Sequence, residues 1–242
     1  MTDSYVCVDL ETTGLDPKRD KIIEIGAVRV REGEVIDQFS EFVNPDRKLE
    51  ERIIELTGIQ DAWLENAHRI EQVLPEFLDF AGEEPLLGHS LRFDFAFLKK
   101  AAVNQDISYE RWGMDTLKIA RKYLSELESR SLPYLCTHFQ IPHTAHRAYE
   151  DAKATSRLFV KLGELFYEKE TLENRLTPGK NLFLPSPLIY QVKKDKPITI
   201  PQKEQLYKLM DRHKLVVEYS IEKLTRSEAS REIARILAEY GR

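Results

Sequence analysis

Apolar residues recur along this chain with two spacings, and each spacing predicts a different kind of element. Continuous or alternating apolar runs predict strands, because successive strand side chains point to opposite faces. Such runs occupy residues 5–10, 21–31, 34–43, 85–87 and 112–115. The pair Glu32-Gly33, between the second and third runs, is typical of a hairpin turn. These runs predict an antiparallel meander of three strands followed by two further strands.

Apolar positions three or four residues apart predict helices. Residues 70–81 show this spacing, with Val73, Leu74 and Phe77 on one helical face. Further helices are predicted at residues 50–56, 94–103, 116–124 and 148–167, and Gly58 follows the first of these as a typical carboxy-terminal cap. Strands alternating with helices predict that residues 1–172 form one α/β domain, a mixed five-stranded sheet flanked by helices.

The end of the chain is organised differently. Residues 173–201 carry five of the eleven prolines and little periodicity, which predicts a linker. Residues 202–213 and 227–240 then predict two helices, the second beginning with the capping box Thr225-Arg226-Ser227-Glu228 and ending at Gly241. Two helices bury little core alone. The small helical module 202–242 therefore either packs on the first domain or docks a partner, and both roles stay open.

The most informative polar feature stands at the end of the first predicted strand. Asp9 and Glu11 are two residues apart, so their side chains point to the same face. Two carboxylates side by side at a buried strand end repel each other and lose solvation, which is costly unless a cation or a shared proton offsets it. A divalent metal is the simplest offset. Because this pattern is also common at solvated strand ends, a metal site needs support from elsewhere in the chain.

Two further segments supply that support. Asp94 stands at the start of a strongly apolar helix, just after the strand predicted at 85–87. His146 stands five residues before Asp151, again at a predicted helix start. Open α/β sheets build their sites at such junctions between strands and helices.

Together the three segments resemble the DEDDh (DnaQ-like) family of 3′→5′ exonucleases, which includes the epsilon-type proofreading subunit of bacterial DNA polymerase III. The matching residues are Asp9-x-Glu11-Thr12-Thr13-Gly14-Leu15, Phe93-Asp94-x-x-Phe97-Leu98 and His146-Arg147-Ala148-x-x-Asp151-Ala152. They follow the family order at family-like spacing, and the resemblance covers roughly residues 4–167. One small departure is Ser90, where many members carry Asn. The resemblance implies a ribonuclease H-like exonuclease fold for the first domain.

The resemblance also implies the catalytic groups. Asp9, Glu11, Asp94 and Asp151 are implied to bind two divalent metal ions, Mg²⁺ or Mn²⁺, with Asp9 as the bridge. Two ions about 3.5–4 Å apart hold the nucleophile and the leaving oxygen of a phosphodiester. Glu11 is also expected to help position the terminal 3′ hydroxyl. His146 is implied as the general base, because a histidine of near-neutral pKa can accept a proton at working pH. Among the six histidines, only His146 has the family's spacing from Asp151.

The expected substrate-binding residues are less distinctive. They are Thr12, Thr13, Leu15, His89 and Phe93. Gly14 lets the backbone of the turn approach a terminal nucleotide, and Leu15 resembles the family's apolar wedge between the last two bases. Phe93 is expected to stack on a base, for which core packing is the alternative. His89 is expected to line the nucleotide pocket or to support the second motif.

The net charge of −5 argues at first against a nucleic-acid partner, but its distribution changes that interpretation. Residues 1–168 carry 21 Lys/Arg and 31 Asp/Glu, whereas residues 169–242 carry 15 and 10. Bound Mg²⁺ or Mn²⁺ would invert the potential of an acidic site. The basic region can attract phosphate, although a merely soluble surface explains it as well. No secretion signal or membrane-length apolar stretch is present, and Cys7 and Cys136 lack metal-binding spacing, so we expect a cytoplasmic protein.

Several alternatives follow from the same residues. A glycosidase also uses paired carboxylates, but it leaves the His146–Asp151 spacing and the Thr-Thr-Gly turn unexplained. A catalytically silent nucleic-acid-binding scaffold would be expected to lack at least one of the five catalytic groups. An RNA-directed exoribonuclease shares all the motifs. The Glu-Thr-Thr-Gly turn and the Ile-Ile-Glu-Ile-Gly-Ala-Val strand at residues 22–28 resemble the DNA polymerase III type more closely, and this resemblance favours DNA. Proofreading would require a DNA polymerase or repair partner, with residues 202–242 as the candidate contact.

Overall fold

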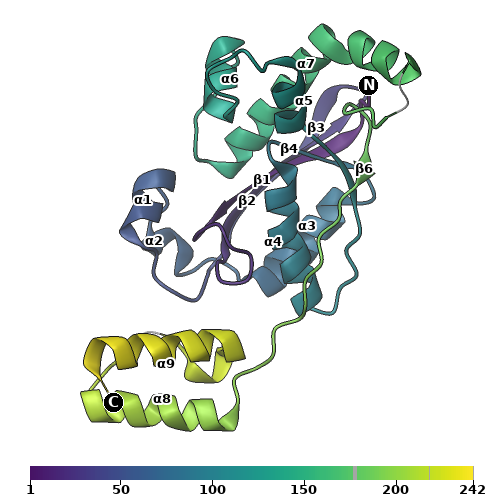
Figure 1. Ribbon diagram of the computed structural model, residues 1–242. Helices are drawn as coiled ribbons and strands as arrows, with labels where there is room; N and C mark the ends of the chain where they lie inside the picture. Colours follow the sequence, from purple (N-terminus) through teal and green to yellow (C-terminus); the bar gives the residue numbers. More distant parts are fainter. Residues whose placement is uncertain (177–178, 218, 242) are drawn as a thin grey trace. The chain divides into compact units, whose positions relative to one another are not determined.

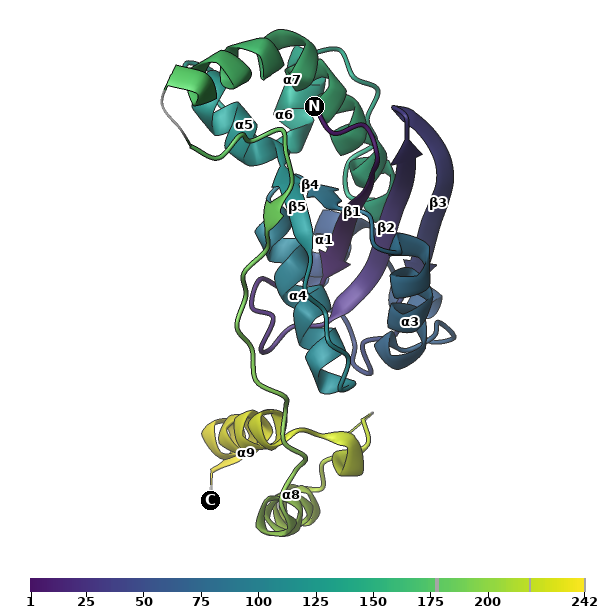
Figure 2. The same ribbon diagram turned by 90° about the vertical axis from the view of Figure 1, so that its right-hand side faces the viewer.

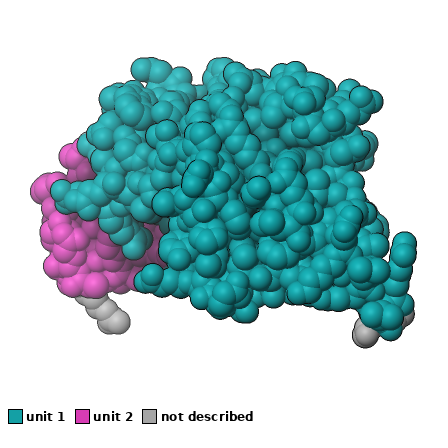
Figure 3. Space-filling model, turned by 90° about the horizontal axis from the view of Figure 1, so that it is seen from above, with its two compact units in different colours: residues 1–191 teal, residues 192–242 magenta. Residues whose placement is uncertain are grey.

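The computed structural model describes residues 1–176, 179–217 and 219–241. They divide into two compact units, Met1–Gln191 and Val192–Arg242 (Figure 3). Among the described helices, none combines the length and the apolar character needed to cross a membrane.

A mixed sheet forms the centre of unit 1, with the strand order β3-β2-β1-β4-β5-β6. The strands are β1 (Tyr5–Thr12), β2 (Ile22–Arg31), β3 (Glu34–Phe42), β4 (Leu86–Gly88), β5 (Trp112–Asp115) and β6 (Ser186–Pro187). The first three form an antiparallel meander, as predicted, and β4 and β5 run parallel to β1. The predicted count of five strands is corrected to six, because the two-residue β6 pairs antiparallel with β5.

Helices cover both faces of the sheet (Figures 1 and 2). They are α1 (Glu51–Thr57), α2 (Asp61–Leu64), α3 (Ile70–Ala81), α4 (Leu91–Asn104), α5 (Thr116–Tyr123), α6 (Leu132–His138) and α7 (Ala148–Leu176). The cap predicted for α1 is confirmed, since Gly58 is left-handed with φ 70°. Helix α4 begins at Leu91, one turn before the predicted start at Asp94. Helices α2 and α6 were not predicted, because both are short.

Strand β1 separates two hydrophobic cores. Val6, Val8 and Leu10 belong to the core beneath α3 and α4, whereas Tyr5 and Cys7 belong to the core beneath α5, α6 and α7. This alternation follows from the pleat of the strand. It directs the next odd-numbered side chains, those of Asp9 and Glu11, toward the face on which α7 packs.

The structure moves the predicted boundary of the first domain from residue 172 to residue 191. Helix α7 continues to Leu176, nine residues past its predicted end. Phe183 is fully buried in the core beneath α7, and the amide of Leu188 donates to the carbonyl of Arg111 over 2.8 Å. The described part of the predicted linker, residues 173–201, is thus largely part of unit 1. Residues 177–178 of that linker lie outside the described residues.

Unit 2 contains α8 (Ile200–His213), the 3₁₀ helix η1 (Ile221–Lys223) and α9 (Arg226–Tyr240). The two helices predicted in residues 202–242 are confirmed, although residues 218 and 242 lie outside the described part. The capping box is also confirmed, because the amide of Thr225 donates to Glu228 over 2.8 Å and the amide of Glu228 to Thr225 over 3.2 Å. The helices enclose a small core of their own, formed by Ile198, Leu206, Leu209, Ile221, Ala229 and Ile236.

Candidate active site

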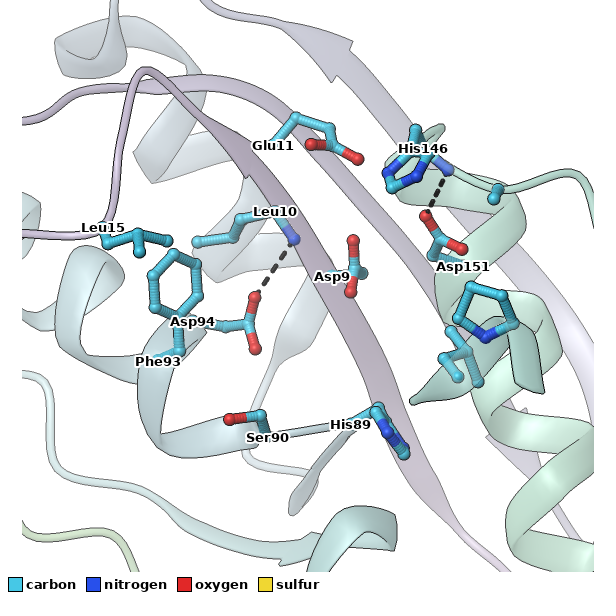
Figure 4. A pocket seen from close by; sticks show the side chains of 13 residues that line it. Asp9, Leu10, Glu11, Leu15, His89, Ser90, Phe93, Asp94, His146 and Asp151 are labelled. Carbon is cyan, nitrogen blue, oxygen red and sulfur yellow. Dashed lines mark hydrogen bonds between the residues drawn. The ribbon is translucent and has the colours of Figure 1, made fainter. Parts of the chain in front are cut away.

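The candidate site lies where β1 ends, between the first turns of α4 and α7 (Figure 4). Asp9 and Glu11 point from β1 into a common pocket of about 320 Å³. Its lining residues are Asp9, Leu10, Glu11, Leu15, His89, Ser90, Phe93, Asp94, Leu132, Pro133, Ala145, His146 and Asp151. All five residues predicted as catalytic are among them, so the fold brings together the three separate sequence motifs.

Two helix starts bring the other acids to the pocket. Asp94, in the first turn of α4, accepts a hydrogen bond from the Leu10 amide over 3.2 Å. Asp151, in the first turn of α7, accepts one from the His146 amide over 2.9 Å, and both bonds are drawn in Figure 4. The first turn of a helix favours a carboxylate because the helix dipole is positive there. Each acid is therefore fixed to the backbone of a neighbouring segment.

The electrostatics of this cluster call for a cation. Burial, and then the neighbouring charges of Asp94 and Asp151, raise the pKa of Asp9 well above its ordinary value. Burial and the charge of Asp151 raise the pKa of Glu11 to about 8. The pKa of Asp94 is raised too, chiefly by burial. Carboxylates that resist ionisation for these reasons are stabilised when a bound metal ion offsets the repulsion.

The geometry identifies a group suited to a metal ion. Asp9, Glu11 and Asp151 each offer an oxygen within 4.8 Å of the other two. Asp94 is outside this group, but it is the strongest electrostatic neighbour of Asp9. In Figure 4, Asp9 lies between Asp94 and Asp151. Hard carboxylate oxygens are the donors that Mg²⁺ and Mn²⁺ prefer, so the residues present fit a divalent cation.

Two histidines stand beside Asp151. The ring of His146 lies toward Glu11 in Figure 4, and its residue adopts a left-handed backbone with φ 65°. His143, which was not predicted to have a role, places Nε2 against Oδ1 of Asp151, and its side chain is almost fully buried. In the sequence, only the spacing from Asp151 distinguished His146 from His143 as the candidate base. The structure gives the two histidines different environments: His146 faces the pocket, whereas His143 contacts Asp151, a proposed metal ligand.

The five predicted substrate-binding residues divide into two groups. Leu15, Phe93 and His89 line the pocket, and Figure 4 shows Leu15 beside Phe93. Leu15 has 84% of its surface exposed, which is unusual for an apolar residue and leaves it free to contact a ligand. Both ring nitrogens of His89 are occupied, by Thr116 over 2.9 Å and by the Arg130 carbonyl over 2.8 Å. Its pKa is lowered, mainly by burial, and its ring forms part of the pocket wall.

Thr12 and Thr13 have side chains engaged within the turn rather than in the pocket. The hydroxyl of Thr12 donates to the Gly14 carbonyl over 2.7 Å. The hydroxyl of Thr13 accepts a bond from the Lys21 amide over 2.9 Å and also contacts Arg47. These bonds fix the turn that presents Leu15.

Sequence reasoning missed two further features of the site. Leu132 and Pro133, at the start of α6, form part of the pocket wall. Glu24 on β2, buried and paired with Arg147, lies directly across the sheet from Glu11. The sequence did contain a sign of this pair. Glu24 interrupts the apolar run Ile22-Ile23-Glu24-Ile25, and an acid in a buried strand is rarely without a partner.

Two solved structures of similar fold are titled as nucleases. Exonuclease X in complex with 5′ overhanging duplex DNA is 24% identical, with a TM-score of 0.55, over 67% of this chain and 92% of that one. The nuclease domain of 3′hExo, described as a DEDDh family member bound to rAMP, is 21% identical, with a TM-score of 0.58, over 68% and 93%. These likenesses show the fold, which is ribonuclease H-like.

The family model RNase_T, described as "Exonuclease", matches residues 6–159, and the chain belongs to this family of DnaQ-like exonucleases. Among curated relatives, "DNA polymerase III PolC-type" of Caldanaerobacter subterraneus subsp. tengcongensis is 39% identical over 68% of this chain. That of Oceanobacillus iheyensis is 37% identical over 93%. The chain spans only 12% and 16% of these two relatives. The predicted family is thereby confirmed.

Proposed function

We propose that this chain is a metal-dependent 3′→5′ exonuclease that releases nucleoside 5′-monophosphates from DNA. The observation that carries the proposal is the convergence of Asp9, Glu11, Asp94, Asp151 and His146 on one pocket. These five groups come from three segments distant in the sequence. The mutual repulsion of the four carboxylates is costly without a cation, and a site for divalent cations and phosphate accounts for the arrangement.

In this proposal the four carboxylates of Asp9, Glu11, Asp94 and Asp151 would hold two divalent ions, Mg²⁺ or Mn²⁺. When bound, the ions neutralise the phosphodiester and activate the attacking and leaving oxygens. His146 accepts the proton of the attacking water, and its position at the pocket allows that role. Glu11 helps to position the terminal 3′ hydroxyl. Leu15 and Phe93 hold the terminal bases through apolar and stacking contacts that are independent of base identity.

DNA is the favoured substrate because the curated relatives are named as DNA polymerases. RNA is the second candidate, since one structure of similar fold is titled for 3′-end recognition of a histone mRNA stem-loop by a 3′-exonuclease. A DNA polymerase or repair protein is the proposed partner, through residues 202–242. The alignment with the Oceanobacillus iheyensis relative covers 93% of the chain, more than the exonuclease family match alone. Action on chromosomal DNA would place the protein in the bacterial cytoplasm.

The test is digestion of matched single-stranded DNA and RNA, each labelled at the 5′ end, with Mg²⁺ or Mn²⁺. A ladder that shortens from the 3′ end on DNA, and is abolished by chelation and by Asp151→Ala, is the expected result. Asp79→Ala on the exposed surface of α3 is the matched control and should leave the ladder intact.

Other outcomes discriminate among the alternatives. Faster cleavage of RNA would retain the mechanism and change the substrate. Cleavage that survives chelation would contradict the metal-dependent mechanism. An intact wild-type chain that cleaves neither polymer would refute the proposed activity and would leave nucleic-acid binding as the alternative.

A further inference from the structure

Glu24 is a buried acid that the proposed chemistry does not use. It stands on β2 directly opposite Glu11 on β1, in the antiparallel register Glu11↔Glu24. Like charges placed opposite each other across a sheet are destabilising, and a buried carboxylate is costly unless it is paired. Its position beside the proposed metal ligands therefore needs a compensating interaction, and the structure contains one.

Both carboxylate oxygens of Glu24 bind the start of α7. Oε1 accepts hydrogen bonds from Nε and Nη2 of Arg147, over 3.3 and 3.1 Å. Oε2 accepts one from the Ala148 amide over 3.2 Å. The guanidinium of Arg147 also lies 5.3 Å from the ring centroid of Phe42 on β3. Two N–H groups of Arg147 thus converge on one oxygen while a backbone amide holds the other, so both the position and the orientation of the carboxylate are fixed.

Gly26 shows how closely this helix start approaches the strand. A Cβ atom at Gly26 would clash with the backbone of Ala148 and Tyr149. The absence of a side chain at Gly26 therefore lets α7 lie directly against β2. Glu24 and Gly26, two residues apart on β2, face the same way, so one provides the ionic contact and the other the space for it.

The segment held in this way carries both functional groups of the third motif. His146 immediately precedes Arg147, and the Asp151 amide donates to the Arg147 carbonyl over 2.9 Å. The His146 amide in turn donates to the Asp151 carboxylate over 2.9 Å. A shift of Arg147 would thus displace a proposed base and a proposed ligand together, relative to Asp9 and Glu11.

We propose that Glu24 and Arg147 are positioning residues that hold His146 and Asp151 in register with the carboxylates of β1. This inference rests on the proposed function. Replacing a residue that orients a metal ligand typically lowers metal affinity or activity by about 10–100-fold. For Arg147→Met we expect Mn²⁺ to bind at least about 10-fold more weakly and kcat to fall by a similar factor, with the oligonucleotide KM nearly unchanged.

The experiment compares full-length variants in two assays, Mn²⁺ binding measured by electron paramagnetic resonance and steady-state hydrolysis. Arg147→Lys keeps the charge but not the two adjacent N–H donors of the guanidinium, so its defect should be intermediate. Glu24→Gln combined with Arg147→Met should be no worse than Arg147→Met alone, because the pair acts as a unit. Arg31→Met is the matched control, because Arg31 lies on β2, the strand of Glu24, and the change removes its exposed pair with Glu84. Thermal unfolding checks that each variant is folded.

The outcomes separate this inference from the proposed function. Arg147→Met and Arg31→Met with equal Mn²⁺ affinity and equal kcat would overturn the positioning role. A raised KM with unchanged kcat and Mn²⁺ affinity would overturn it too, and would assign Arg147 to substrate binding. If the wild-type chain binds Mn²⁺ but cleaves nothing, the exonuclease proposal fails, while the comparison of Mn²⁺ affinities still decides the positioning role.

Discussion

Phe183 offers the sharpest test of where unit 1 ends. Its ring is fully buried, 5.9 Å from the centroid of Phe159 and 5.7 Å from that of Tyr167, the latter edge to face. Replacing a buried phenylalanine with alanine typically costs about 3–5 kcal/mol. With a urea m value of about 2–3 kcal/mol/M, Phe183→Ala should lower the unfolding midpoint by about 1–2.5 M.

Tryptophan fluorescence is the appropriate assay, because Trp63 and Trp112 are the chain's two tryptophans and both lie in unit 1. Unit 2 therefore contributes no tryptophan signal. Leu184→Ala is the matched control. The side chain of Leu184, next to Phe183 in the sequence, is 44% exposed, so its replacement should change the free energy of unfolding by no more than about 0.5 kcal/mol. Equal midpoints for the two variants would refute the packing of this segment against α7.

Three further predictions address the boundary, a buried acid and the proposed base. A 1–191 fragment should unfold cooperatively and retain hydrolysis of a dinucleotide. A 1–172 fragment, which lacks Phe183, should be destabilised. Equal stability of the two fragments in urea unfolding would contradict the boundary. Burial opposes ionisation of Glu170, but hydrogen bonds from Lys122 and Tyr123 outweigh it and lower its pKa. The ionised form therefore stabilises the fold. The loss of stability caused by Glu170→Gln should be largest above the usual glutamate pKa and should shrink as the pH falls below it. Thermal midpoints between pH 3 and 7, with the exposed Glu168→Gln as control, test this sign, and a difference independent of pH would disprove it. His146→Ala should lower kcat by about 10²–10⁴-fold, and single-turnover rates matching those of His68→Ala would exclude His146 as the base.

The sheet and the main helices could be predicted from the sequence because their apolar patterns are long. The ten residues of β2 and the twelve of α3 each contain several repeats of their spacing. Strand β6 has two residues, one of them proline, and no periodicity can be seen in so short a segment. Helix α6 has seven residues with Pro133 at its start, so its pattern was similarly short. Phe183 lies in a proline-containing stretch, where composition suggested a linker and long-range packing decided otherwise.

The candidate site was predictable to the extent that its residues form contiguous motifs. Asp9 and Glu11 share a strand, and His146 and Asp151 share a helix start. The pairing of Glu24 with Arg147 joins positions 123 residues apart. Strand register and the approach of α7 at Gly26 create that contact, and neither can be read from a single sequence. The contact of His143 with Asp151 depends likewise on the path of the loop before α7.

The carboxylate cluster has a consequence for stability that is separate from its chemistry. Burial and mutual repulsion raise the pKa values of Asp9, Glu11 and Asp94, so keeping these acids ionised at neutral pH opposes folding when no cation is present. That cost disappears once the pH is below the ordinary carboxylate range. Neutral amides at the same positions would remove activity and raise the melting temperature of the metal-free chain. Natural selection for activity therefore keeps the fold below its attainable stability at these positions.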